Sequence, residues 1–335
     1  MQAPRLDMAP RKLENPPADP AAAEVRVLHK LVEALYADGA PGRARGLEDL
    51  AQTGTAGFRR EPIFGQGRAA SPPKPGLRVV AGVEEQKLLD IVRDGLRQDR
   101  VDLYLQPIVS LPQRKRRFYE CYSRIRAEDG SIITPDRYLD LARQAGLLTA
   151  IDNMLLFRCV NLMRKLQKRD IATRFFCNIS AFSLSDRAFF AEFVEYMKSH
   201  AELAPQLVLE IGQSDLARHF AQSAPDLERL KNMGYRLSID RVDDFSALDI
   251  EHFSVLGIEF VKLPAQVILD KANAGQGNEF RRLKQRLDAA EVDLIVEKIE
   301  SEQMLVELLE FSIDFGQGYL FGEPRISKDP EGRGT

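Results

Sequence analysis

The sequence has few of the residues that build disulfide frameworks, metal clusters or membrane spans. Its three cysteines, Cys121, Cys159 and Cys177, lie inside apolar runs, so we expect reduced, buried thiols of a cytosolic protein rather than disulfides. The four histidines are scattered without metal-ligand spacing. No apolar run approaches the roughly 18 residues of a membrane-spanning helix, and the N-terminus lacks the apolar core of a signal peptide. We therefore expect any membrane anchor outside this chain or on a partner.

The chain also lacks a strong net charge. Its 335 residues are 44% hydrophobic and 29% charged, which is typical of a soluble globular protein. This length allows one large domain with a tail, or two ordinary domains. A net charge of -3 predicts no strong attraction to nucleic acid or to an anionic membrane, so nucleic acid is not expected as a partner.

Residues 1–83 are poor in the apolar side chains that a core requires. More than half of the 18 prolines lie there, among Gly, Ala and Arg clusters. Such a segment buries too little apolar surface to offset its ordering entropy, so we expect a largely disordered tail. One stretch near residues 22–36 has apolar residues at helical spacing. It predicts a short amphipathic helix, which is either transient or a docking or coiled-coil end.

Residues 84–335 are predicted to form one domain in which strands and helices alternate. Eight apolar runs predict strands, the last of them weakly: Val101–Ile108, Arg117–Ile125, Phe175–Ile179, Leu207–Ile211, Arg236–Ile239, Phe260–Leu263, Leu294–Val296 and Ser312–Phe315. Helical patterns occupy Val83–Arg97, Pro135–Ala145, Ile151–Lys168, Ser185–Ser199, Ala224–Met233, Glu279–Ala290 and Ser301–Glu310. This alternation indicates parallel β/α units, and about eight of them suit a TIM-like (β/α)8 barrel.

Two details refine this prediction. A doubly wound open sheet is the alternative, but it usually carries a Gly-rich phosphate turn after its first strand, and none is present. The first two runs are joined only by the short polar turn from Pro112 to Arg116, so they should form an antiparallel pair. We therefore expect a barrel with an antiparallel first strand.

Polar and charged residues close most of the predicted strands. They are Glu120, Asn178, Glu210, Asp240, Lys262 and Glu297. Any one of them alone could be a helix cap or a solvated rim residue, because a charge at the end of an apolar strand is costly unless it is paired, coordinated or solvated. Together they predict a shared site, since a barrel directs the side chains at its strand ends to one face.

Carboxylate and amide oxygens at one barrel face suit divalent metal ions. Mg²⁺ and Mn²⁺ prefer such hard ligands. Two metals a few ångströms apart would hold the attacking water and the leaving oxygen of a phosphodiester. The predicted metal ligands are Glu120, Asn178, Glu210 and Asp240.

Several short motifs follow one another in a fixed order between about residues 88 and 326. They are Leu105-Gln106-Pro107-Ile108, Glu120-Cys121-Tyr122 with Arg124, Asn178-Ile179-Ser180, Leu209-Glu210-Ile211, Asp240, Lys262, Glu297 with Glu300, and Gln317 to Gly322. In this order and spacing they resemble the EAL family of cyclic di-GMP phosphodiesterase and receptor barrels.

The resemblance implies a TIM-like barrel of EAL type and assigns roles to the motif residues. The residues expected to contact cyclic di-GMP are Gln106, Glu120, Arg124, Asp240, Arg241 and Gln317. In an active relative, Glu297 and Lys262 would help to orient or activate water; here they would be a catalytic remnant.

The chain departs from the family pattern at the metal site. The second Asp of the family's DDFGTG loop, a metal ligand in active members, is Arg241 here, and the glycines of that loop are absent. Asp243 or Asp244 would have to supply the lost ligand from a shortened loop. The Gly of the family's AEGVE motif is Lys298, and only the Glu of the family signature is kept.

Arg241 admits more than one interpretation. Replacing a carboxylate by a guanidinium changes the local charge by two units, and each unit is worth roughly a few kcal/mol at about 4–6 Å, enough to abolish binding of at least one metal. A guanidinium is also a good bidentate partner for phosphate, so Arg241 could favour holding an intact cyclic dinucleotide. The simpler interpretation is a surface salt bridge, such as one with Asp243.

Three segments resemble a narrower group, the TipF-type alphaproteobacterial branch of the family. They are Asp102 to Arg116, Phe176 to Ser180 and Ile295 to Ser301. Members of that branch are degenerate EAL receptors connected with flagellum assembly and polarity. They usually carry membrane spans and a coiled coil before the barrel, and neither is expected in this sequence.

The leading hypothesis is a degenerate EAL domain, probed by its altered metal site, that binds cyclic di-GMP without hydrolysis and signals to an unidentified protein partner. We expect it in the cytoplasm, with recruitment to the membrane or the flagellar pole as a further expectation. One alternative is an active Mg²⁺- or Mn²⁺-dependent phosphodiesterase producing pGpG. The other is an interaction scaffold that has lost the nucleotide. A metal cofactor is expected only if the chain is active, and a homodimer stays open.

Overall fold

The structure is a computed structural model that describes residues 75–169, 173–242 and 244–327. The expected helix near residues 22–36, and the expected tail up to residue 74, lie outside the described residues. The first described element is helix α3 (Pro75–Arg97), which begins before the predicted Val83. Proline is compatible with the first position of a helix because that residue needs no hydrogen-bonded N–H, so the proline-rich composition did not prevent an earlier start.

Eight strands close into a barrel. They are β1 (Val101–Ser110), β2 (Lys115–Arg126), β4 (Arg174–Asn178), β5 (Leu207–Gly212), β6 (Arg236–Asp240), β7 (Ile258–Pro264), β8 (Asp293–Glu297) and β9 (Phe315–Gln317). Their order around the sheet is β1-β9-β8-β7-β6-β5-β4-β2, and pairing of β1 with β2 closes the ring. Short strands β3 (Ile132–Ile133) and β10 (Arg325–Ile326) attach to β2 and β1. The closed ring rules out the doubly wound open sheet.

Strand β1 is antiparallel to both of its neighbours in the ring, β2 and β9. Every other neighbouring pair in the ring is parallel. In this register Gln106 lies opposite Glu120, and Ile108 lies opposite Gln317. The predicted TIM-like barrel with an antiparallel first strand is therefore confirmed.

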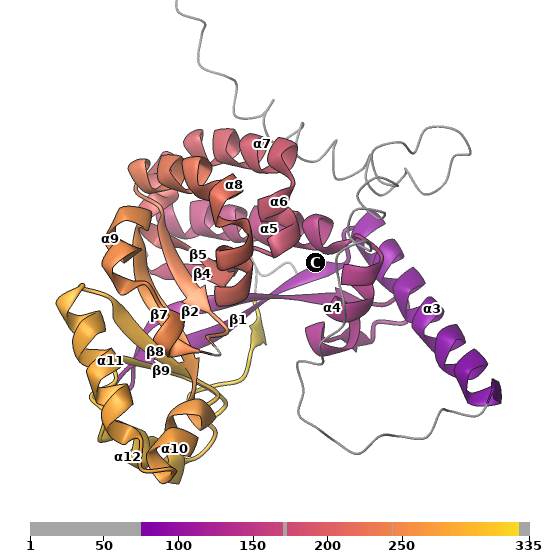
Figure 1. Cartoon of the computed structure of the whole chain (residues 1–335). Coiled ribbons are helices and arrows are strands. Elements are labelled where there is room, and N and C mark those ends of the chain that lie inside the picture. The colour runs from indigo at the N-terminus through magenta and orange to yellow at the C-terminus, as the bar shows by residue number, and fades with distance from the viewer. Residues whose placement is uncertain (1–74, 170–172, 243, 328–335) are drawn as a thin grey trace, which may run out of the picture.

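Helices surround the outside of the barrel (Figure 1). They are α4 (Pro135–Gln144), α5 (Leu148–Gln167), α6 (Ala181–Ser185), α7 (Arg187–Lys198), α8 (Gln213–Asn232), α9 (Phe253–Leu256), α10 (Ala265–Asn273), α11 (Gly277–Ala289) and α12 (Glu302–Leu309), with 3-10 turns η2 (Ala201–Gln206), η3 (Phe245–Ala247) and η4 (Ile250–His252). The predicted helix Ser185–Ser199 is divided at Asp186, whose side chain caps α7 by accepting from the backbone N–H of Phe189.

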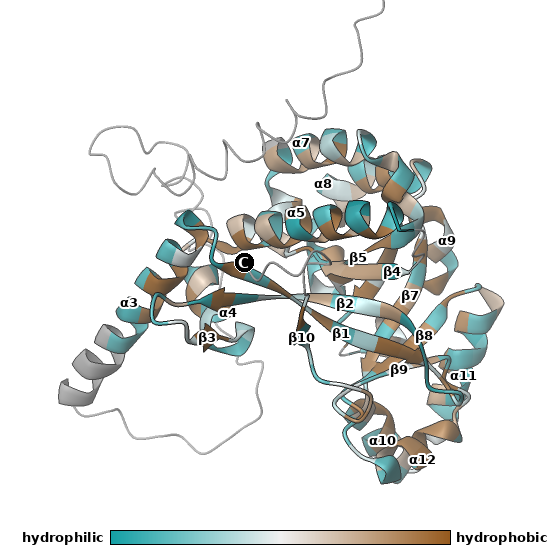
Figure 2. Ribbon diagram, turned by 180° about the vertical axis from the view of Figure 1, so that it is seen from behind, coloured by the Kyte–Doolittle hydropathy of each residue, from teal (hydrophilic) through white to brown (hydrophobic). Residues whose placement is uncertain are grey.

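Two apolar cores hold these layers together. The larger one lies between the strands and the surrounding helices, where the cartoon shows mostly hydrophobic strands and helices of mixed polarity (Figure 2). The smaller one joins α3, α4 and the start of α5 to the ends of β1 and β2 that extend beyond the barrel, and it contains Leu96, Ile125 and Tyr138. The hydroxyl groups of Ser123 and Tyr138 lie 2.7 Å apart and link β2 to α4 inside this core.

The interior of the barrel is filled by an apolar layer that we call the plug. Its members are Ile108, Phe118, Phe176, Val208, Phe260, Ile295 and Phe315. The rings pack against one another, with centroids 4.9 Å apart for Phe118 and Phe315 and 5.0 Å apart for Phe176 and Phe260. The barrel is therefore a packed core with no pore, as in other barrels of this class.

Candidate functional site

The candidate site is the polar layer directly above the plug. Side chains two residues apart on a strand point in the same direction, so each plug residue places the side chain two positions further on above it. This spacing produces the layer Glu120, Asn178, Glu210, Lys262, Glu297 and Gln317, with Gln106 on the antiparallel β1 and Asp240 above Ser238 on β6. Strand geometry thus brings together the strand-end residues that the sequence predicted.

Lys262 lies at the centre of this layer. Its side chain is completely buried, and its Nζ lies 2.5 Å from Glu120 Oε2 and 3.1 Å from Glu210 Oε1. Both carboxylates are themselves almost fully buried. Three ionisable groups from β2, β5 and β7 therefore share one dry space, in which charge is tolerated only because it is paired.

Amide side chains complete the hydrogen bonding of Glu120. Asn178 Nδ2 donates to Oε1 at 3.1 Å, and Gln317 Nε2 donates to Oε2 at 2.8 Å. Gln317 Nε2 also lies 3.0 Å from Gln106 Oε1, and Gln106 Nε2 donates to the carbonyl of Gly322 at 3.1 Å. The two glutamines therefore connect the buried carboxylate to the loop that follows β9.

Burial and mutual charge set the protonation of the three central groups. Burial by itself would lower the pKa of Lys262, but the carboxylates of Glu120 and Glu210 outweigh it and raise that pKa well above its usual value. Burial by itself would raise the pKa of Glu120, but the Lys262 ammonium holds it below its usual value. Burial, together with the charge of Glu120, raises the pKa of Glu210 well above its usual value. Lys262 and Glu120 therefore form the ionised pair, and Glu210 is the carboxyl that is more readily protonated.

Asp240 and Arg241 lie at the end of β6 and differ in their surroundings. Asp240 is 8% exposed, and its Oδ1 has no hydrogen-bond partner among the described residues. The Arg241 side chain is 55% exposed; its Nη2 lies 2.9 Å from Asp215 Oδ2 and its Nε lies 4.0 Å from Asp240 Oδ2. Asp243, suggested from the sequence as the salt-bridge partner, lies outside the described residues; the partner observed is Asp215, in the first turn of α8.

Gly212 provides the space that the Arg241 side chain occupies. A Cβ atom added at this glycine would lie 2.4 Å from Arg241 Nη2, so a larger residue would force the guanidinium to move. Arg241 itself adopts a left-handed backbone with φ of 51°. For a residue with a Cβ atom, this conformation costs roughly 1–2 kcal/mol.

Glu297 and Lys298 form a similar arrangement at the end of β8. The Glu297 side chain is 15% exposed, and Lys298 Nζ lies 3.8 Å from its Oε1. Burial raises the pKa of Glu297, while the charge of Lys262 opposes this shift. Lys298 has φ of 59°, so it keeps a left-handed backbone that a glycine would adopt more easily.

Arg124 lies on the same face of β2 as Glu120, four residues further along. Its guanidinium carbon is 4.6 Å from the centre of the Tyr104 ring, a cation–π contact across the β1–β2 pair. Its Nε is buried without a hydrogen-bond partner among the described residues. Arg124, Arg241 and Glu297 thus lie around the hydrogen-bonded centre and make none of its hydrogen bonds.

Two residues that the sequence did not single out for the site take part in its hydrogen bonding. Gln317 Nε2 lies 3.2 Å from the hydroxyl of Tyr122, which is also hydrogen-bonded to Glu120. Ser238 Oγ donates to Glu210 Oε1 at 3.3 Å. Tyr122 lies two residues after Glu120, so strand periodicity alone would have placed it on the same face.

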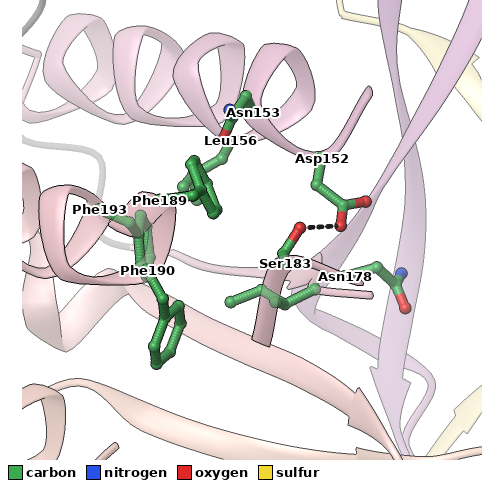
Figure 3. A pocket seen from close by; sticks show the side chains of 9 residues that line it. Asp152, Asn153, Leu156, Asn178, Ser183, Phe189, Phe190 and Phe193 are labelled. Atoms are coloured by element: carbon green, nitrogen blue, oxygen red, sulfur yellow. Dashed lines mark hydrogen bonds between the residues drawn. The ribbon is translucent and has the colours of Figure 1, made fainter. Parts of the chain in front are cut away.

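A small cavity adjoins the end of β4, on the far side of Asn178 from the phenylalanines that line it (Figure 3). Its free space of about 10 Å³ suits a single water molecule, which excludes a nucleotide. Asp152 of α5 borders it and accepts hydrogen bonds from Ser183 Oγ at 2.7 Å and from the backbone N–H of Ser180 at 2.8 Å. These bonds fix the loop after β4, and hence the position of Asn178.

A divalent ion does not fit this layer unless Lys262 moves. Glu120 and Glu210, two of the predicted metal ligands, both face the Lys262 ammonium. Asn178 directs its amide nitrogen, which cannot bind a metal, toward Glu120. Within the part of the chain that the structure describes, no group of three or more His, Cys, Asp or Glu side chains is arranged to hold a metal ion. Asp240 Oδ1 is the predicted ligand atom that is left buried and unpartnered.

A search of the described helices for membrane spans found none that is long and apolar enough. Comparisons with known proteins found two similar curated relatives among others. Cyclic di-GMP phosphodiesterase NbdA of Pseudomonas aeruginosa is 28% identical over 254 residues, and cyclic di-GMP phosphodiesterase PdeF of Escherichia coli is 24% identical over 244 residues. These matches cover 73% and 71% of this chain but 32% of each relative, so the chain spans about a third of their length.

Solved structures and a family model agree with the observed barrel. The FimX EAL domain from Pseudomonas aeruginosa, solved bound to cyclic di-GMP, has a TM-score of 0.61 and 22% identity, and the match covers 70% of this chain and 95% of that one. The model of the EAL domain family matches residues 89–324. Since this match includes most of the chain and every strand of the barrel, the chain belongs to the EAL domain family.

Proposed function

We propose that this chain binds cyclic di-GMP at the polar layer and holds it without hydrolysing it. The observation that carries the proposal is the Lys262 ammonium, buried 2.5 Å from Glu120 and 3.1 Å from Glu210. It puts a positive charge between two predicted metal ligands, and this charge would repel a divalent ion there. The relatives named as cyclic di-GMP phosphodiesterases, and the FimX domain bound to cyclic di-GMP, support the choice of ligand.

Residues around the buried centre would contact the nucleotide. Arg124 and Arg241 would bind phosphate, because a guanidinium matches phosphate oxygens in a bidentate manner. Asp240 Oδ1 and Gln317 Oε1 are buried acceptors without partners among the described residues. They would accept hydrogen bonds from N–H or O–H groups of the ligand, and Gln106 would help to hold Gln317 in place.

We propose further that the loaded domain signals to a protein partner in flagellar assembly or motility. The support for this part is the resemblance of three sequence segments to the TipF-type branch. The expected place of action is the cytoplasm, with recruitment to the membrane or the flagellar pole. Sedimentation with and without the nucleotide would test whether a homodimer takes part.

Calorimetric titration of cyclic di-GMP into the full chain, once with Mg²⁺ and once with EDTA, tests the main proposal. We expect saturable binding in both conditions and recovery of intact nucleotide by chromatography. The linear dinucleotide pGpG serves as the control ligand. Absence of binding in both conditions would reject both functions that involve the nucleotide and leave the interaction scaffold.

An active phosphodiesterase is the second candidate, and one observation favours it. The unpartnered Asp240 Oδ1 is an oxygen that a metal ion could take if Lys262 withdrew. Against it, Asp244, one of the two expected replacement ligands, caps η3 by accepting from the backbone N–H of Ser246 at 2.9 Å. Mn²⁺-dependent formation of pGpG that disappears in Glu120→Ala would establish this candidate in place of the receptor.

A further inference from the structure

Two cations lie at the rim of the site in matching positions. Arg241 directly follows β6, and Lys298 directly follows β8. Both have left-handed backbones, with φ of 51° and 59°, and both side chains are largely exposed, at 55% and 70%. This backbone favours glycine. The chain therefore places long cationic side chains at two strand ends where the backbone alone would select a residue without one.

Neighbouring carboxylates position each cation and leave most of its donors unused. Arg241 has one contact of 2.9 Å, to Asp215, and a longer one of 4.0 Å to Asp240. The nearest carboxylate oxygen to Lys298 Nζ, that of Glu297, is 3.8 Å away. A guanidinium has five N–H donors and an ammonium has three, so both residues keep donors for a ligand.

The rim and the buried centre differ in their charge. In the centre, the Lys262 ammonium lies between Glu120 and Glu210, so its charge is already matched by carboxylates. Outside this centre, Arg124, Arg241 and Lys298 extend from β2, β6 and β8. A cyclic dinucleotide carries two phosphodiester charges, and charges of this kind bind best to cations that are close but not yet fully paired.

We infer that Arg241 and Lys298 bind the phosphodiester groups of the nucleotide in the place of divalent metal ions, so that binding is independent of metal. This inference rests on the proposed function, because it assigns residues to the ligand of that same site. Arg241 supplies a bidentate contact, and Lys298 supplies a point charge that can follow the ligand on a flexible stem.

Glycine substitutions test this assignment, because glycine keeps the left-handed backbone and removes the cation. We would titrate cyclic di-GMP in EDTA into the full-length wild type, Arg241→Gly, Lys298→Gly and the double variant. Each single substitution should raise Kd about tenfold, and the double substitution about a hundredfold. The wild-type Kd should agree within about twofold between EDTA and Mg²⁺ if no metal takes part.

Arg114→Gly is the matched control. Arg114 also has a left-handed backbone, with φ of 54°, and it forms an exposed ion pair with Glu302. It lies in the β1–β2 turn, beyond the ends of those strands that are furthest from the site, so its removal should leave Kd unchanged.

The outcomes separate this inference from the function on which it rests. Unchanged affinity in the double variant, loss of wild-type binding in EDTA, or an equal loss in Arg114→Gly would overturn the inference and leave nucleotide binding in place. No binding by the wild type, with or without Mg²⁺, would reject the proposed function and this assignment together.

Discussion

The ammonium of Lys262 has no exposed surface, and carboxylates of two other strands lie within 3.1 Å of it. Taking such a group out of water is costly unless its charge is matched at close range. The pair with Glu120 therefore has a structural role as well as a place in the site. Removing one partner should be more harmful than removing both, because an unpaired buried charge is the most expensive arrangement.

Lys262→Met replaces the ammonium by an apolar side chain of similar length. We expect the free energy of unfolding at pH 7 to fall by about 3–5 kcal/mol, since the Glu120 carboxylate is left buried without its cation. Urea unfolding followed by circular dichroism measures the loss. Lys262→Met/Glu120→Gln should recover part of it, and a double variant that is less stable than the single one would contradict this account.

Tyr122 is expected to position Glu120 and Gln317 through its hydroxyl. Tyr122→Phe removes the group that lies 3.2 Å from Gln317 Nε2, and we expect a loss of about 1–3 kcal/mol in unfolding free energy. Tyr104→Phe is the control on the opposite strand, because the Tyr104 hydroxyl makes no hydrogen bond in the described part of the chain. Equal effects of the two substitutions in urea unfolding would show that the hydroxyl of Tyr122 has no special role.

At the scale of strands and helices, the sequence predicted the strands better than the helices. Every parallel strand except β9 was placed within about two residues, because apolar runs of strand length leave few alternatives. The weakest run, Ser312–Phe315, was shifted, since β9 (Phe315–Gln317) is short and contains a glycine. Helix α10 was missed entirely because its nine residues follow β7 without a polar break.

The start of α8 explains why the partner of Arg241 could not be predicted. The helix was expected from Ala224, because Pro225 commonly marks a first turn. The structure instead continues the helix through Pro225 from Gln213, which brings Asp215 into its first turn beside Arg241. The strand-end residues were predictable from local periodicity, whereas this contact depends on how two loops pack.

Helix α3 packs closely against β2 at Gly95. A Cβ atom there would lie 2.5 Å from Ile125 Cγ2, so Gly95→Ala should lower the unfolding free energy by about 1–3 kcal/mol through overpacking. Gly82→Ala, in the same helix but with nothing within 4 Å, should instead stabilise by about 0.5–1 kcal/mol. Chemical denaturation of both variants decides the matter, and a destabilising Gly82→Ala would show that helix propensity is not the controlling factor.

The link between α5 and the loop after β4 should respond to pH through Asp152. Burial raises the pKa of Asp152, although hydrogen bonds from Ser180 and Ser183 oppose the shift. The folded state then binds the proton more tightly than the unfolded state, so this group's contribution to stability is complete below the unfolded pKa of about 3.9 and is lost as pH rises through the folded pKa.

Asp152→Asn removes this titration and keeps an acceptor for the serines. The unfolding free energy of the variant relative to wild type should therefore increase as pH rises from about 4 to about 7. Urea unfolding at four or five pH values gives the difference directly. Curves that stay parallel over this range would contradict the assignment of the pH effect to Asp152.

For the molecule as a whole, the site draws on strands from all around the ring, so a bound nucleotide should stabilise the entire barrel. At a free concentration of 100 times Kd, a ligand that binds only the folded state adds about 2.7 kcal/mol to the unfolding free energy. We expect cyclic di-GMP to give this shift in EDTA, measured by denaturant unfolding, and pGpG to give less. No shift under saturating nucleotide would remove the nucleotide from the account of this protein.

Lys262 also affects how many species a solution of this protein contains. A metal site is filled by mass action, so a preparation is a mixture of empty, half-loaded and fully loaded molecules whose proportions follow the supply of the ion. A lysine between Glu120 and Glu210 is part of the chain and is present once in every folded copy. The folded molecules are therefore identical at this position, and neither dialysis nor competition with other ions can change its occupancy.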